Sequence, residues 1–172
     1  MSEAIVDPGL VPALLSGYTL SIIVRWLSKI FRQMTGWFLA LLPIGLFVYF
    51  LSLIDEVAGG QMLTASITWV PSLGVDITFI VDGWGLCLAL IVSGMGALVI
   101  VYASSYLKGH AALGRFYTFI LIFMASMLVL VLADNVFLMF IAWELTSISS
   151  FFLIGFYHEK EKSQKAALQA LL

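Results

Sequence analysis

Long stretches without a charged residue constrain this chain more than any other feature of its sequence. A bilayer core about 30 Å thick requires roughly 20 apolar residues in an α-helix. Five stretches meet or approach that length, at residues 9–26, 35–54, 84–106, 116–133 and 136–157. Only 10% of the residues are charged, whereas soluble domains carry about 25%. The sequence therefore predicts an all-α polytopic membrane protein, and it excludes a soluble enzyme and a nucleic-acid-binding protein.

The C-terminal residues have the pattern of a sixth helix that has only begun. Apolar residues recur from residue 166 and stop at residue 172, which is too short a distance to cross a bilayer. We therefore expect residues 1–172 to form one membrane domain that is truncated at its C-terminus. A natural five-helix protein with a short tail at the membrane surface is the alternative.

Basic residues fall on one side of this predicted topology. The eight Lys and Arg residues occupy alternate loops, whereas the opposite loops carry acidic residues and no basic ones; the basic residues are Arg25, Lys29, Arg32, Lys108, Arg115, Lys160, Lys162 and Lys165. Loops rich in Lys and Arg face the cytoplasm. The N-terminus is therefore predicted to lie outside the cell.

The long outer loop, residues 55–82, has an alternating pattern of its own. Leu63, Ala65 and Ile67 alternate with polar residues, and a similar alternation resumes at Val75 after a Pro-Ser-Leu-Gly turn sequence. This period of two is typical of strands. We expect an extracellular β-hairpin that serves as a structural cap and not as a binding site.

Glu144 is the one charged residue inside the stretch 136–157. It is the ninth residue of that predicted helix, which places it roughly 12 Å from the outer end at 1.5 Å per residue. A carboxylate at such depth costs on the order of 2.5–3.5 kcal/mol, and such residues usually belong to ion or proton pathways. The structural alternative is a protonated Glu144 that hydrogen-bonds a neighbouring helix and fixes helix packing.

Hydroxyl groups surround Glu144 along the helix. Ser147 lies three residues further on, hence on the same face, and is the second candidate for the pathway. Trp143, Thr146 and Ser150 are weaker candidates. The hydroxyls are compatible with a water chain next to the carboxylate, and equally with bonds to carbonyls of their own helix.

Motifs for other chemistry are missing from the sequence. The single cysteine, Cys87, excludes an intrachain disulfide and a cysteine-cluster metal site. The sequence contains no Gly-rich phosphate loop, and it shows no Ser/His/Asp set. We expect no cofactor and no metal to be held by this chain. A stripe of small residues in the third stretch, Ala89, Ser93 and Ala97, predicts a close contact between helices.

Several segments together resemble a known family. The run Trp143-Glu144-Leu145-Thr146-Ser147-Ile148-Ser149-Ser150 is similar to the large A subunit of the Mrp-type multisubunit Na+/H+ antiporter. Val81-Asp82-Gly83-Trp84 and Asp134-Asn135 fit the same pattern. The resemblance covers residues 35–172. The wider superfamily includes the antiporter-like membrane subunits of respiratory complex I.

The resemblance implies part of a secondary transporter and not an enzyme. Together with other membrane subunits in a prokaryotic plasma membrane, it would exchange cytoplasmic Na+ for external H+. Glu144 would pair with a lysine on a later helix, within a bundle of two inverted repeats. The alternatives are a proton-pumping membrane subunit of a redox-driven complex and a non-transporting scaffold subunit. The transported cation, the stoichiometry and the conduction of Na+ by this chain are left open.

Overall fold

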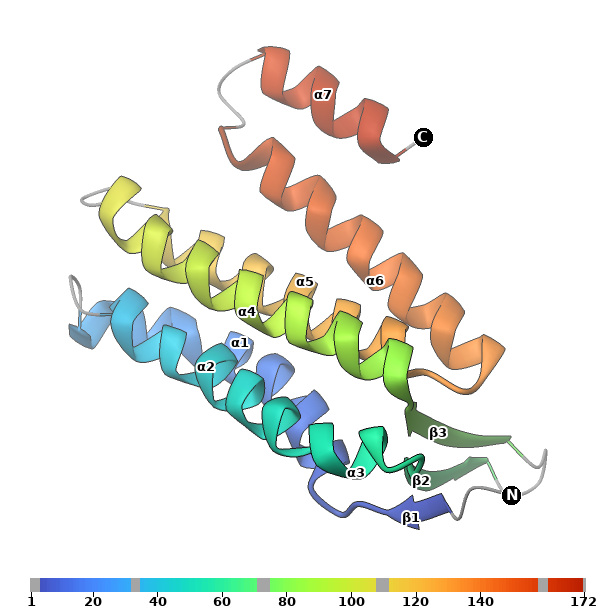
Figure 1. Cartoon of the computed structure of the whole chain (residues 1–172). Coiled ribbons are helices and arrows are strands. Elements are labelled where there is room, and N and C mark those ends of the chain that lie inside the picture. The colour runs from blue at the N-terminus through green and yellow to red at the C-terminus, as the bar shows by residue number, and fades with distance from the viewer. Residues whose placement is uncertain (1–3, 32–34, 71–74, 108–111, 158–160, 172) are drawn as a thin grey trace.

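Helices dominate the part of the chain that the computed structural model describes, which comprises residues 4–31, 35–70, 75–107, 112–157 and 161–171. Figure 1 shows the elements, which follow in chain order as β1 (Ala4–Val6), α1 (Leu10–Phe31), α2 (Thr35–Ser52), α3 (Ile54–Ala58), β2 (Met62–Val70), β3 (Val75–Val81), α4 (Gly83–Tyr106), α5 (Leu113–Leu132), α6 (Val136–Ile154) and α7 (Glu161–Leu171). A 3-10 turn, Gly155–Tyr157, follows α6.

Within the part of the chain that the structure describes, four helical segments are long and apolar enough to cross a membrane: Thr35–Ala58, Gly83–Tyr106, Leu113–Leu132 and Val136–Ile154. The apolar part of α1 is shorter and covers Leu10–Val24. Four of the five predicted spans are therefore confirmed as helical segments that are long and apolar enough to cross a membrane, and a fifth crossing by α1 stays a prediction.

Two observed helices extend beyond the predicted ranges into segments that flank an apolar run and contain charged residues. Helix α1 continues past residue 26 to Phe31, and α7 begins at Glu161 instead of residue 166. Lys, Arg and Glu have high helix propensity, so they prolong a helix although they add no apolar surface. The predicted stretch 35–54 is divided between two helices in the structure: α2 ends at Ser52, and the short helix α3 follows it.

A small sheet covers one end of the helices (Figure 1). Strands β2 and β3 pair antiparallel, with Leu63 opposite Val81 and Ala65 opposite Phe79. These four side chains are buried, so the alternating pattern places its apolar face on the bundle. Strand β1 adds to β2 in parallel, which extends the predicted hairpin to a three-stranded sheet in the order β1-β2-β3.

Close helix packing forms the core beneath this sheet. Helix α2 packs on α4, α1 packs on α5, and α4 packs on α5. Ala89 and Ser93 of the small-residue stripe are fully buried, and Gly96 of the same helix lies against Met124. Helix α6 lies outside this four-helix group, where it packs mainly against α5 and α7 (Figure 1).

Candidate functional site

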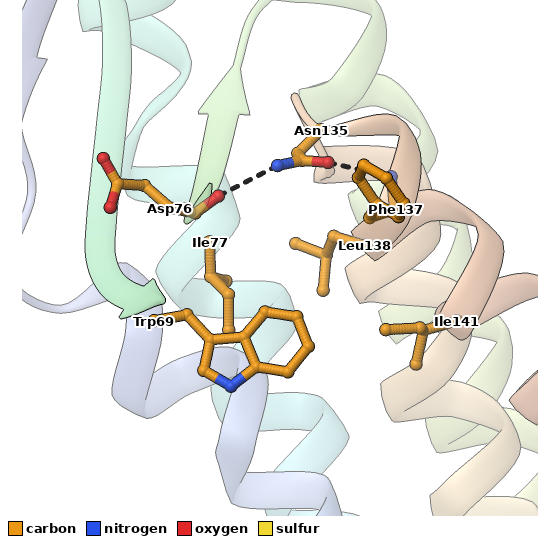
Figure 2. Close-up of a pocket in the computed structure, with 7 residues that line it drawn as sticks. All are labelled: Trp69, Asp76, Ile77, Asn135, Phe137, Leu138 and Ile141. Carbon is orange, nitrogen blue, oxygen red and sulfur yellow. Dashed lines mark hydrogen bonds between the residues drawn. The ribbon is translucent and has the colours of Figure 1, made fainter. Parts of the chain in front are cut away.

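Helix α6, which carries Glu144, is fixed at its first turn by Asn135. The Asn135 side chain accepts a hydrogen bond from the backbone N–H of Phe137 at 2.8 Å and donates one to the carbonyl oxygen of Asp76 at 3.0 Å (Figure 2). The first bond caps the helix, and the second joins the helix start to β3. Asp134 adds a backbone bond to the carbonyl oxygen of Thr78 in the same strand. The start of α6 is therefore held on the sheet.

The far end of α6 is held by Arg115 of α5. The Arg115 guanidinium donates a hydrogen bond of 3.0 Å to the carbonyl oxygen of Phe156. The same guanidinium lies 5.5 Å from the centre of the Phe156 ring, within the range of a cation–π contact. With both ends fixed, the rotation of α6 about its axis is fixed as well.

This rotation places Glu144 on the side of α6 that faces away from α5. Ala142 and Ser149 are the buried residues of α6. Successive helical residues are about 100° apart, so Glu144 lies about 200° around the helix from Ala142. In agreement with that geometry, Glu144 is exposed at the surface of the described chain. The described helices thus provide no partner helix on the Glu144 side.

Apolar side chains surround this carboxylate. Phe137, Phe140 and Ile148 lie seven residues before, four before and four after Glu144, and they are 68%, 63% and 46% exposed. These spacings place them on the same side of the helix as Glu144. The result is an apolar helix face with one carboxyl group near its middle.

The hydroxyl groups near Glu144 divide into two sets. Thr146 donates a hydrogen bond to the carbonyl oxygen of Trp143 at 2.6 Å, and Ser150 donates one to that of Ser147 at 2.9 Å. Both hydroxyls therefore donate to their own helix and keep only their acceptor lone pairs for another partner. Thr146 lies two residues from Glu144, hence on nearly the opposite face. Ser147 is half-buried and, by spacing, shares the side of Glu144.

A groove that sequence reasoning missed lies beside the start of α6. It has a volume of about 310 Å³ and is lined by Trp69 and Ile77 of the sheet and by Phe137, Leu138 and Ile141 of α6, with Asp76 and Asn135 at its polar edge (Figure 2). Trp69 of β2 lines this groove opposite α6. The groove forms where the hydrogen bond from Asn135 to the carbonyl oxygen of Asp76 joins α6 to the sheet. No local sequence pattern predicts this bond.

No group of three His, Cys, Asp or Glu residues that could hold a metal ion occurs among the residues that the structure describes. The candidate residues that the sequence predicts on this side of α6 remain Glu144 and, by helical spacing, Ser147.

This chain is similar to known proteins over nearly its whole length. Residues 67–117 match the family model "NADH-Ubiquinone oxidoreductase (complex I), chain 5 N-terminus", and residues 133–172 match "NADH:quinone oxidoreductase/Mrp antiporter, TM". Among curated proteins, the A subunit of the Na(+)/H(+) antiporter from Alkalihalophilus pseudofirmus is 41% identical, and its counterpart from Bacillus subtilis is 44% identical, each over 162 residues. Each alignment covers 93% of this chain and 20% of the relative.

A solved structure is similar to this chain in its fold as well as in its sequence. One chain of the Mrp complex from Dietzia sp. DQ12-45-1b superposes with a TM-score of 0.81 at 35% identity. The match covers 95% of this chain and 17% of that chain. This chain thus spans about a fifth of the length of the relatives that it matches.

Proposed function

Because this chain resembles the A subunit of the Mrp-type Na+/H+ antiporters over nearly its whole length, we propose that it is a segment of such a subunit. The complete protein exchanges cytoplasmic Na+ for external H+ together with other membrane subunits of the same complex. It acts as a secondary transporter and not as an enzyme. The observation that carries this proposal is the 44% identity across 93% of the chain.

The proposed topology places the N-terminus and the sheet outside the cell and the start of α7 in the cytoplasm. Two observations support it. All Lys and Arg residues lie outside the predicted apolar segments' interiors, in regions of the sequence that alternate with acidic loops. The strands gather at one end of the bundle, away from the C-terminal end of α6 (Figure 1). Helix α1 then forms the fifth crossing, and the chain supplies part of a bundle with inverted repeats.

Glu144 is proposed to carry protons or ions within the membrane, with Ser147 beside it. A carboxylate facing lipid at mid-membrane costs on the order of 2.5–3.5 kcal/mol, so the exposed face of α6 requires a polar partner. We assign that partner to a lysine on a later helix of the complete protein. An ammonium that approaches a carboxyl group favours its ionised form, and withdrawal favours the protonated form. Movement of one charge can thereby drive transfer of another.

Variants of Glu144 in the complete complex test this role. Glu144→Gln keeps the size and hydrogen-bonding ability of the side chain but removes its titration, and Glu144→Ala removes both. Both variants are expected to assemble normally and to abolish Na+-driven proton movement in inverted vesicles, whereas Glu144→Asp retains partial activity. Glu56→Gln changes an exposed carboxyl group of α3 and provides the matched control, with activity unchanged.

A scaffold role gives a different pattern in the same assay. If Glu144 only fixed helix packing, Glu144→Gln would transport like the wild type, and Glu144→Ala alone would disturb assembly. A fully active, correctly assembled Glu144→Gln complex would remove this residue from the pathway.

A proton-pumping subunit of a redox-driven complex is the second candidate function. The match of residues 67–117 to a complex I model favours it specifically. The two candidates differ in their partners, because a redox-driven complex contains flavin or iron–sulfur proteins. Purification of the native complex, followed by absorption spectroscopy and identification of its subunits, distinguishes them.

A further inference from the structure

Helix α4 has two sides of opposite composition. The side packed against α2 and α5 consists mainly of small residues, among them Gly85, Ala89 and Ser93. The other side is exposed in the described chain and carries large apolar side chains. They recur every three or four residues, which places them in one line along the helix: Leu88, Ile91, Met95 and Leu98, with exposed fractions of 42%, 55%, 56% and 66%. Small residues let membrane helices approach closely, so α4 already uses its helix-packing side within this bundle.

Exposed aromatic residues mark both ends of this line. Trp84, in the first turn of α4, is 80% exposed, and Tyr102 and Tyr106 near its last turn are 65% and 67% exposed. At 1.5 Å per residue, the two tyrosines lie about 27 and 33 Å from Trp84 along the helix. The hydrocarbon core of a bilayer is about 30 Å thick. Trp and Tyr are enriched where a membrane meets water, so the aromatic residues have the spacing of the two bilayer surfaces.

Two neighbouring helices continue the aromatic level at the tyrosine end. Trp26 of α1 and Trp37 of α2 are 68% and 61% exposed. Helices α1 and α4 end, and α2 begins, at the end of the bundle opposite the sheet (Figure 1). Helix α2 is packed against both α1 and α4. Each tryptophan lies within five residues of its helix end, hence within about 8 Å along the axis. Three adjacent helices therefore expose aromatic rings at one level.

The polar groups on the exposed side of α4 differ from those of α6. Between Trp84 and Tyr102, no exposed residue of α4 carries a charge, an amide or a hydroxyl group; the exposed residues there are Cys87, Leu88, Ile91, Met95 and Leu98. In α6, by contrast, Trp143 is 60% exposed and Glu144 is exposed, and both lie near the middle of the helix. The exposed side of α4 therefore needs no polar partner at mid-membrane, whereas that of α6 does.

We propose that the exposed side of α4 from Trp84 to Tyr106 contacts the acyl chains of the phospholipid bilayer in the complete complex. Trp84 lies at the headgroup level of one leaflet. The two tyrosines, together with Trp26 and Trp37, lie at that of the other leaflet. Further helices and subunits are then added on the side of α6 and not on the side of α4. This lipid contact stands whether or not the complete protein transports sodium.

Truncation of Leu98 distinguishes lipid from protein as the neighbour of α4. Acyl chains adapt to a smaller side chain, whereas a packed protein helix leaves a cavity. Leu98→Ala in the complete complex should therefore change the thermal midpoint by less than about 2 °C. Ile100→Ala is the matched control on the same helix, because Ile100 is fully buried, and its midpoint should fall by about 4–8 °C. A Leu98→Ala midpoint as low as that of Ile100→Ala would overturn the proposal.

Collision rates of a nitroxide spin label give a readout that does not depend on stability. In a cysteine-free background, the complete complex with a label at Met95→Cys is reconstituted in phospholipid vesicles. This label should collide often with O2, which is concentrated among acyl chains, and rarely with a water-soluble nickel chelate. A label at Glu56→Cys, at an exposed position of α3, is the control and should show the reverse. Rare collisions of the Met95→Cys label with both reagents would indicate a covering protein helix, and frequent collisions with the chelate would indicate a water-filled path. Either result overturns the lipid contact.

Discussion

Gly17 controls how closely α1 approaches α5, and Gly17→Ala tests the packing of these helices. A Cβ atom at Gly17 would lie 2.8 Å from the Cβ atom of Ala125 and 3.4 Å from the carbonyl oxygen of Leu121. Carbon atoms in contact prefer about 3.5 Å or more, so the helices must separate locally by roughly 0.7 Å. The neighbouring bond between Tyr18 and the buried Ser126, now 2.9 Å, would lengthen with them.

The expected loss of stability in Gly17→Ala follows from these contacts. Insertion of a methyl group into a packed interface destabilises by about 1–3 kcal/mol. Alanine recovers up to about 1 kcal/mol of helix propensity relative to glycine. With the full propensity gain the net loss is about 0–2 kcal/mol, which lowers the thermal midpoint by up to roughly 8 °C for a domain of this size.

Gly45→Ala is the matched control in the neighbouring helix. A Cβ atom at Gly45 of α2 meets no atom within 4 Å, so only the propensity gain remains. Its midpoint should equal or exceed that of the wild type. Both variants are measured in the complete complex in detergent by fluorescence-detected thermal unfolding. A Gly17→Ala midpoint equal to that of Gly45→Ala would refute the close α1–α5 contact.

Two further predictions concern the cap of α4 and the topology. Asp82→Ala removes the side-chain oxygen that accepts from the backbone N–H of Gly85 at 2.7 Å, and loss of such a cap, about 1 kcal/mol, should lower the thermal midpoint by about 2–4 °C. Asp82→Asn retains an acceptor and should restore most of the loss; equal midpoints for both variants would argue against the cap. In a cysteine-free background, Asp76→Cys and Lys165→Cys should react with a membrane-impermeant thiol reagent from opposite sides of the membrane. Reaction of both from one side would contradict the topology.

The apolar spans could be read from the sequence because the membrane imposes a local requirement. Whether about 20 successive residues are apolar depends on no distant contact, and four of the five predicted stretches meet this criterion in the structure. The strand pairing from Leu63 to Val81 was similarly readable, because a sheet with one buried face alternates along its own sequence. The depth of Glu144 follows from counting residues along one helix, so the candidate residue itself needed no structure.

The sequence could not predict which side of α6 packs against α5, and therefore could not predict that Glu144 faces away from α5. A membrane helix is apolar both where it meets lipid and where it meets protein, so its pattern does not reveal the packed face. The contacts of Ala142 and Ser149 with the rest of the fold turn Glu144 away from α5 and separate it from Thr146. The sequence also could not predict the parallel pairing of β1 with β2, because the three residues of β1 are too few to show an alternating pattern. The close approach of Tyr117 to Gly36 joins residues more than 80 positions apart, and only the packing of α2, α4 and α5 brings them together.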